Sequence, residues 1–524
     1  MKGMEQLKEL VYVVNKNKVK RIELLDLNDE NSSKVNQLYQ AISEGSVNSD
    51  EEAFELLFNE NQTKSGYRNL KMTLYERLLN TVFFIDAYQS KSTDRQIAYY
   101  EAYKDFAAVQ ILLAKHARKT GISLFEKLLR KAERYELIDL IIPVSRALRM
   151  YYGTQDGEEK KYKHYSNLLR QYQEVDRLET LAEEYYSSLI MQFVNKKSKT
   201  TDLQARAHKY VVKLTKHIDE KSSYKYYLYT SLVELFEYTC VNDYGSIIEM
   251  CDRMIAFFEK KPYSANTPIQ IFLHHQLVAY LQLRMFDKGE EVARKSQQLI
   301  EEGSFNWFKN LEYLFLLAMH TANDQKAYAI YNEAIDHKSF AFLSTTIQEM
   351  WNLYHAYLQL LVDQNMVELD KGDKHFTAFR INRFLNDMPT YSKDKRGMNI
   401  AILVIQILFY IQKKKYDAAI DAMEAIEKYC SRYLFKEDTM RSYYFIQLLL
   451  TIIKASFHIK AVNRYAKKPL AKLKDISTEI SNQFHKIEII PYETLWELAL
   501  LMLDTKEVRV KRATRQRSKR KENS

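Results

Sequence analysis

The sequence predicts an all-α protein, a superhelical array of antiparallel helix pairs preceded by a helical N-terminal module. With 11 Gly and 6 Pro among 524 residues, the chain has few of the residues that make tight hairpins. Hydrophobic residues make up 46% and charged residues 28% of the chain, which is typical of a folded protein. The stretch Asn399–Cys430 has the recurring design: an apolar segment, a short lysine turn and a second amphipathic segment.

Residues 1–95 form the predicted N-terminal helical module. Its helices are expected over Met4–Val14, Val19–Leu27, Ser33–Ser43, Asp50–Phe58 and about Tyr67–Tyr88. The helix over Asp50–Phe58 is expected to begin in Asn48-Ser49-Asp50-Glu51. There, side-chain oxygens accept hydrogen bonds from free backbone amides, and acidic side chains favour the positive end of the helix dipole.

A DNA-reading helix-turn-helix is the alternative interpretation of this module. Ala41 and Gly45 have the spacing of its first helix and turn. The neighbouring positions that such a fold must bury carry polar or charged side chains, namely Gln40, Glu44, Ser46 and Glu51. A helical cap or docking module is therefore the preferred interpretation.

Residues 96–505 are predicted to form the repeat array, closed by a capping helix. The array is expected to start with Ser123–Arg134, which leads into Tyr135–Tyr152, and with a long helix that ends near Phe193, followed by Leu203–Ile218. The expected pairs are Tyr224–Thr239 with Tyr244–Phe258, Gln270–Leu283 with Phe286–Ile300, Asn310–His320 with Asp324–Ile335, Thr346–Leu361 with Lys374–Leu385, and Ile400–Ile411 with Tyr416–Tyr429. The helices Thr439–Ile459, Leu470–Phe484 and Tyr492–Leu503 end the array.

The spacing of the second helices indicates a repeat. Four of them are expected to begin at Tyr244, Phe286, Asp324 and Tyr416, and these starts are 42, 38 and 92 residues apart. The last interval is twice 46, with Lys374–Leu385 as the intervening second helix. A period of about 40 is typical of a solenoid built from helical hairpins.

Large and small residues recur at fixed positions of these pairs. The clearest copy has Leu311 and Leu314 on its first helix and Ala327, Tyr331 and Ala334 on its second. Small residues let two helices approach closely, while the aromatic ring fills the neighbouring groove.

This pattern resembles the tetratricopeptide repeat over roughly residues 120–485, and the overall layout resembles that of uncharacterised bacterial helical-repeat proteins. Near Tyr416, Gln406 and Ile407 replace the usual leucine and small residue, which implies elongated and irregular hairpins. The resemblance implies a scaffold that binds a protein or peptide partner in a groove lined by first helices. Polar or aromatic residues on those helices are the predicted groove residues: Tyr238, Gln276, Tyr280, Gln406 and Tyr410.

No pattern of catalytic or ligand-binding residues emerges. His274 and His275 are neighbours, so on a helix their side chains diverge by about 100° and cannot hold one metal, and we expect one to face inward and one outward. Cys240 and Cys251 flank a turn and are expected to be core thiols. The sequence contains no glycine-rich phosphate loop and no nucleophile elbow. We therefore predict no enzymatic activity, no cofactor and no metal site.

The basic tail is the strongest signal outside the fold. From Lys506 to Ser524 it holds nine Lys and Arg against two Glu, a net charge of +7 out of +10 for the chain. We expect residues 506–524 to be disordered and to offer an anionic partner Arg509, Lys511, Arg512, Arg515, Arg517, Lys519, Arg520 and Lys521. A nucleic-acid- or ribosome-associated factor is thus one alternative function. A ligand-responsive regulator, with residues 1–95 as its output module, is another.

Cysteine content and hydropathy predict a cytoplasmic protein. Three Cys cannot form a disulfide framework, which favours a reducing compartment. Glu5, Lys8 and Glu9 precede any apolar run, unlike a secretion signal. The longest apolar run, Ile400–Ile411, is shorter than the roughly 20 residues that a membrane span needs.

Overall fold

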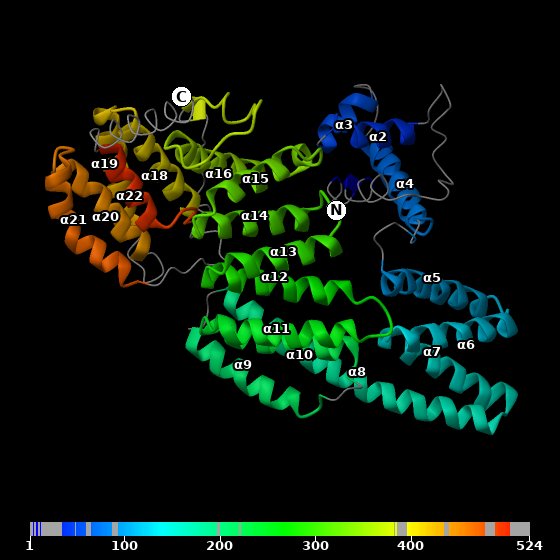
Figure 1. Ribbon diagram of the computed structural model, residues 1–524. Coiled ribbons are helices and arrows are strands. Elements are labelled where there is room, and N and C mark those ends of the chain that lie inside the picture. Colours follow the sequence, from blue (N-terminus) through cyan, green and yellow to red (C-terminus); the bar gives the residue numbers. More distant parts are fainter. Residues whose placement is uncertain are drawn as a thin grey trace, which may run out of the picture. The chain divides into compact units, whose positions relative to one another are not determined.

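The structure is a computed structural model of the chain, and Figure 1 presents it as a ribbon. It describes residues 4, 7, 8, 11, 34–47, 49–58, 64–85, 88, 93–195, 200–218, 222–381, 383–384, 396–433, 440–476 and 488–503. In these ranges the elements are helices without a β-strand, and successive helices pack against one another. The predicted all-α array is confirmed. No helix in the described ranges is long and apolar enough to cross a membrane.

The chain forms two compact units. The first comprises Met1–Ser198, Arg206–Glu234 and Lys260–Ala265, and the second comprises Lys199–Ala205, Leu235–Glu259 and Asn266–Ser524. The division runs through the helices α9 (Thr200–Thr215) and α10 (Tyr224–Cys240). The predicted boundary between residues 95 and 96 stays a prediction.

The N-terminal part of the first unit includes α2 (Lys34–Ser43), α3 (Asp50–Leu57) and α4 (Lys64–Val82). As predicted, a side-chain oxygen starts α3, because Ser49 Oγ accepts the amide of Glu52 at 3.2 Å. The last helix lies earlier at both ends than the predicted Tyr67–Tyr88. The predicted helix Val19–Leu27 lies outside the described residues.

Four further helices continue this unit: α5 (Asp94–Ala114), α6 (Arg118–Arg134), α7 (Ile138–Tyr151) and α8 (Glu159–Val194). Each packs on the next around a core that includes Phe125 and Ile141. A capping box begins α5, since Thr93 Oγ1 accepts the Gln96 amide while Gln96 Oε1 accepts the Thr93 amide.

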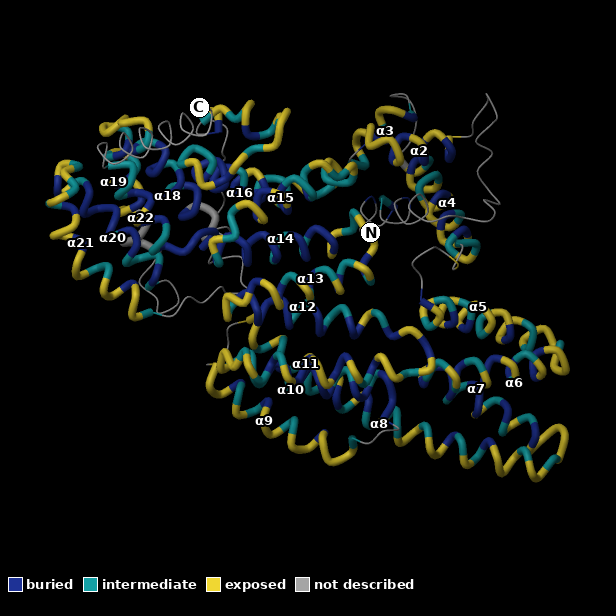
Figure 2. The backbone as a smooth tube through the Cα atoms, in the orientation of Figure 1, coloured by how far each residue is buried: buried dark blue, intermediate teal, exposed yellow. Residues whose placement is uncertain are grey.

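The second unit contains the repeated pairs. Its helices are α11 (Tyr244–Glu259), α12 (Asn266–Leu283), α13 (Phe286–Leu299), α14 (Phe305–His320), α15 (Asp324–Ile335), α16 (Thr345–Asp363), α18 (Arg396–Gln412), α19 (Tyr416–Tyr433), α20 (Met440–Lys454), α21 (Ile459–Lys474) and α22 (Tyr492–Leu503). The four predicted starts of second helices are the first residues of α11, α13, α15 and α19. Buried residues run along most of α14, which lies among α12, α13 and α15 (Figure 2).

The predicted second helix Lys374–Leu385 is wrong over its first half, where residues 374–378 form turns. Asp373 lies at the start of this segment. Its Oδ1 accepts the amide of Phe376 at 2.8 Å, and its Oδ2 accepts the hydroxyl of Tyr328 at 2.8 Å. The bond from the Phe376 amide has the spacing of a helix N-cap, so contacts outside the segment account for the missing helix: the ring of Phe376 packs on the rings of Tyr328, Tyr331 and His355.

The predicted helix Leu470–Phe484 is also wrong, because the observed helix is α21, which runs through Pro469 to Lys474. A proline inside a helix removes a hydrogen bond and is usually a break. Here Val462, Ala466 and Leu473 are buried on α21, which packs on α20. That packing outweighs the proline. Residues 477–484 lie outside the described residues.

One turn recurs before the second helices. A residue with positive φ lies two positions before each of α6, α7, α11, α13, α15 and α19, namely His116, Glu136, Asn242, Arg284, Ala322 and Lys414. The next amide donates to the carbonyl five residues earlier, as in Met285 to Tyr280 at 3.0 Å and Asn323 to Ala318 at 2.9 Å. This is the Schellman motif, which usually places glycine at the left-handed position. This chain places side chains there instead, at a cost of about 1 kcal/mol each.

Ala322→Gly is therefore expected to raise the free energy of unfolding of the second unit by about 1 kcal/mol. Ala329→Gly is the matched control, because Ala329 is an exposed residue inside α15, where glycine should lower that free energy by about 1 kcal/mol. The measurement is urea unfolding followed by the fluorescence of Trp307, Trp351 and Trp496, which all belong to the second unit. Shifts of the same sign in both variants would contradict the strain at Ala322.

Candidate functional site

The candidate site lies on the first helices of the pairs in the second unit. We call the surface formed by α12, α14, α16, α18 and α20 the first-helix face. Two parts of it carry polar side chains in enclosed surroundings. One is the polar row, which we define as His274, Lys309, Glu312, Tyr313 and Tyr354. The other is a buried cluster around Arg441.

The polar row links three first helices. Lys309 Nζ lies 3.0 Å from Glu312 Oε2 and 4.9 Å from the ring centre of Tyr313, all on α14. The hydroxyl of Tyr354 on α16 donates to Glu312 Oε1 at 3.0 Å. The ring of His274 on α12 packs edge-on against Tyr313, with centres 5.0 Å apart. Each side chain thus holds the next in place.

Burial and neighbouring groups determine which side chains of the polar row are charged. Burial lowers the pKa of His274 to about 4, with a further contribution from Lys309, so its imidazole is neutral at pH 7. Burial also lowers the pKa of His275, to about 3. Both rings are half-buried, rather than one buried and one exposed as expected. Burial would lower the pKa of Lys309, but Glu312 and Tyr313 raise it, and the ammonium stays charged.

The polar row presents a neutral imidazole, an ion pair and the half-buried ring of Tyr313, which suit hydrogen bonding and stacking with a bound chain, while Tyr354 is buried beneath them. Among the residues that the structure describes, no group of three His, Cys, Asp or Glu is placed to hold a metal ion. The sequence offers one signal for this row, the two opposite charges Lys309 and Glu312 on one first helix, and that signal does not by itself identify a site.

The residues predicted to line the groove lie elsewhere on the first helices. Tyr238, Gln406 and Tyr410 are half-buried, whereas Gln276 and Tyr280 are buried. Gln276 Nε2 donates to Asp252 Oδ1 at 2.6 Å, so its amide group already has a partner inside the unit.

The three predicted tyrosines occupy equivalent positions, because each supplies the carbonyl that accepts the bond of the recurring turn. The structure does not bring them together with the polar row, and their role in binding stays a prediction. The predicted anion-binding residues of the tail lie outside the described residues: Arg509, Lys511, Arg512, Arg515, Arg517, Lys519, Arg520 and Lys521.

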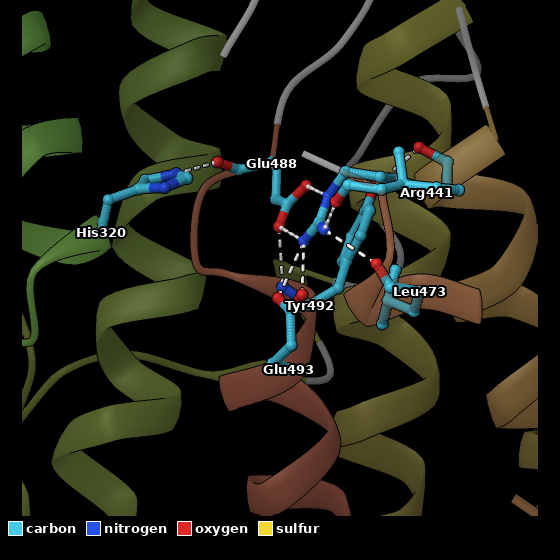
Figure 3. Close-up of polar contacts among 8 residues, drawn as sticks. His320, Arg441, Leu473, Glu488, Tyr492 and Glu493 are labelled. Carbon is cyan, nitrogen blue, oxygen red and sulfur yellow. Dashed lines mark hydrogen bonds and ion pairs between the residues drawn. The ribbon is translucent and has the colours of Figure 1, made fainter. Parts of the chain in front are cut away.

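The Arg441 cluster lies where the chain enters α22 (Figure 3). Nε and Nη2 of Arg441 donate to the two carboxylate oxygens of Glu488 at 3.0 and 2.8 Å, and Nη2 also lies 2.8 Å from Glu493 Oε2. Nη1 donates to the carbonyls of Leu473 and Ile476 at 3.2 and 2.8 Å. The guanidinium is thus fully used. Burial would raise the pKa of Glu493, but Arg441 lowers it below its usual value.

Glu488 also joins this cluster to the middle of the array. Its backbone oxygen lies 2.5 Å from Nε2 of His320, the last residue of α14 (Figure 3). Burial lowers the pKa of His320 to about 4, so the ring is neutral and Nε2 carries the donated proton. The carboxylate of Glu488 accepts the amide of Tyr492 at 2.8 Å and so caps the start of α22.

The helix α22 then covers α18 and α20, the two first helices that precede it. It packs on α18, α20 and α21, and its residues Leu495, Trp496 and Ala499 are at most 2% exposed. The ring of Tyr492 stacks on Phe445 of α20, with centres 4.4 Å apart. A segment of the chain itself therefore occupies the first-helix face over α18 and α20, while the polar row lies on α12, α14 and α16.

Comparison with known protein families, with curated proteins and with solved structures finds no match to this chain.

Proposed function

We propose that the chain is a tetratricopeptide-like scaffold that binds a protein or peptide partner through its first-helix face. The observation that supports this function best is α22 itself. The face formed by α18 and α20 accepts the largely apolar helix α22, and it holds that helix by a charged anchor at its start and by buried apolar side chains. Grooves that take a helix in this way are a recurring mode of peptide recognition.

The polar row is the proposed contact surface for the partner on the remaining first helices. The side chains of its Lys309–Glu312 pair are 22% and 15% exposed. A charged pair in such enclosed surroundings interacts more strongly with a polar partner than a pair in open solvent, because water screens it less.

The test compares two variants that each remove one positive charge. Lys309→Gln changes the polar row and still provides a donor for Glu312, whereas Lys288→Gln changes an exposed position on the second helix α13. Peptides are selected from a displayed random library against the full chain, and their affinities for both variants are measured. We expect Lys309→Gln to weaken binding about tenfold and Lys288→Gln to leave it unchanged. Equal affinities in both variants would remove the polar row from the proposal.

A further inference from the structure

The helix α6 in the first unit exposes only basic and hydroxyl side chains: Arg118, Lys119, Thr120, Ser123, Lys127, Arg130 and Arg134. Residues three or four positions apart share one side of a helix. We therefore define the basic stripe of α6 as Lys119, Ser123, Lys127, Arg130 and Arg134. At about 1.5 Å per residue it is about 22 Å long, enough for several consecutive phosphates of a nucleic acid strand.

The stability of α6 does not account for these charges. Within the described ranges, no carboxylate is paired with a basic residue of the stripe. Lys119 lies in the first turn of α6, where the helix dipole disfavours a cation, and the like charges of Arg130 and Arg134 are four residues apart. Like charges that lower helix stability and form no internal pair indicate a ligand of opposite charge.

A cavity of about 500 Å³ lies between α5 and α6, which pack side by side, at the C-terminal end of the stripe. Its lining combines two tyrosine rings, two guanidinium groups and two carboxylates: Tyr88, Tyr135, Arg130, Arg134, Asp94 and Glu101. Glu101 is occupied, since it accepts the hydroxyl of Tyr88 at 2.5 Å and the ammonium of Lys131 at 3.1 Å. Asp94 forms no ion pair within the described part of the chain.

This combination distinguishes between kinds of anionic partner. An acidic peptide or an anionic membrane needs only the cations, and the carboxylates of the cavity repel it. A nucleotide matches both parts, because its phosphate is anionic while its base is a neutral aromatic ring with amino groups that donate hydrogen bonds. The base stacks on a tyrosine ring and donates to Asp94. Bases of a duplex are paired inside the stack, so only an unpaired base enters such a cavity.

We infer that the basic stripe of α6 binds the phosphates of a single-stranded nucleic acid and that the adjoining cavity receives one of its bases. Lys119, Lys127, Arg130 and Arg134 contact the phosphates, and the ring of Tyr88 stacks on the base. This binding goes beyond the proposed function. It is located in the first unit, whereas the proposed peptide surface belongs to the second, and it does not use the basic tail.

The test of the stripe uses the full chain and a fluorescent single strand of about twelve nucleotides, as RNA and as DNA. Affinity is measured by fluorescence polarisation across a salt series. Lys119→Gln combined with Lys127→Gln should weaken binding about tenfold and reduce the slope of log affinity against log salt by about 1.4, because two phosphate contacts are lost. Binding of either strand in this way supports the inference.

The matched control for the stripe is Lys209→Gln combined with Lys213→Gln, two exposed lysines of α9 in the first unit. This variant loses the same charge and should keep the affinity and the salt slope. Every variant retains residues 506–524, so any contribution of the tail is common to all of them. Circular dichroism and cooperative unfolding verify that the helices of each variant remain formed.

The cavity is tested in the same assay. Tyr88→Leu should weaken binding of the single strand about tenfold and leave the salt slope unchanged, since it removes a stacking ring and no phosphate contact. Tyr88→Phe keeps the ring and should bind like the wild-type chain. The control is Tyr100→Leu, because Tyr100 is an exposed tyrosine of α5 outside the cavity lining, and it should have no effect. A duplex of the same sequence should bind about tenfold more weakly than the single strand.

Three results would overturn the inference. The first is equal affinity for the stripe variant and the α9 variant. The second is a Tyr88→Leu chain that binds like the wild-type chain, or a duplex that binds as tightly as the single strand. The third is competition by polyglutamate or by phosphatidylserine vesicles that matches competition by the unlabelled strand, because the partner would then be an acidic protein or a membrane. None of these results affects the Lys309→Gln experiment, which measures peptides on the second unit.

Discussion

Arg441→Met is expected to lower the free energy of unfolding of the second unit by about 3–5 kcal/mol. Arg441 is 8% exposed and satisfies two carboxylates and two backbone carbonyls. Methionine has a similar length but carries no charge, so the substitution leaves Glu488 buried without its counter-charge. Urea unfolding, followed by the fluorescence of the three tryptophans of this unit, measures the loss.

Arg294→Met is the matched control for this prediction. Arg294 lies 3.0 Å from Glu333 in the same unit, but both side chains are at least one-third exposed. We expect a loss below about 1 kcal/mol. Adding Glu488→Gln to Arg441→Met should recover part of the large loss, because it removes the unpaired buried charge. Losses of equal size for Arg441→Met and Arg294→Met would mean that burial of the Arg441 cluster does not determine its energy.

Glu179→Gln is expected to stabilise the first unit at alkaline pH by about 3 kcal/mol and to change little near pH 5. Glu179 on α8 is 4% exposed, and the hydroxyl of Ser223 donates to its carboxylate at 2.6 Å. Burial raises the pKa of Glu179 from 4.5 to about 7, despite the opposing effects of Ser223 and Lys225. Glutamine is always neutral and still offers an oxygen to Ser223.

The direction of the pH dependence follows from proton binding. Between pH 4.5 and about 7 the folded unit holds a proton on Glu179 that the unfolded chain has released. The stability of the wild-type unit therefore falls as the pH rises through this window, and Glu179→Gln should abolish that part of the fall.

Hydrogen exchange of α8 and α10, corrected for the intrinsic effect of pH, measures this stability. Glu184→Gln, at an exposed site on the same helix, should keep the wild-type profile. If Glu179→Gln also keeps the wild-type dependence of stability on pH, the carboxyl of Glu179 is already ionised in the folded unit.

The sequence was sufficient to predict the helical class and the repeat. Apolar periodicity and turn residues located the starts of α11, α13, α15 and α19, because those signals are local. The predictions from the sequence were wrong for the helices near Lys374 and Pro469, where contacts with other helices determine the structure. Asp373 is held by Tyr328, which precedes it by 45 residues, and α21 is held by its packing on α20.

The candidate site was less predictable than the fold. Polar residues on first helices either line a groove or form internal hydrogen bonds, and sequence spacing does not separate the two. Gln276 illustrates this limit, since its amide is bonded to Asp252. Lys309 and Glu312 become a candidate site only through Tyr354 and His274, which come from two other helices. The Arg441 cluster likewise joins residues from separate segments.

The contact between His320 and Glu488 changes how the second unit folds. Most packing in this unit is between helices one or two places apart along the chain, and such an array can form and fray one hairpin at a time. This contact joins residues 168 positions apart and so closes a long loop of chain. It forms only after the intervening hairpins have brought its ends together, which makes it a late step of folding. Under a stretching force, the hairpins between α14 and α22 would resist together until the His320–Glu488 contact breaks. They would then extend one after another.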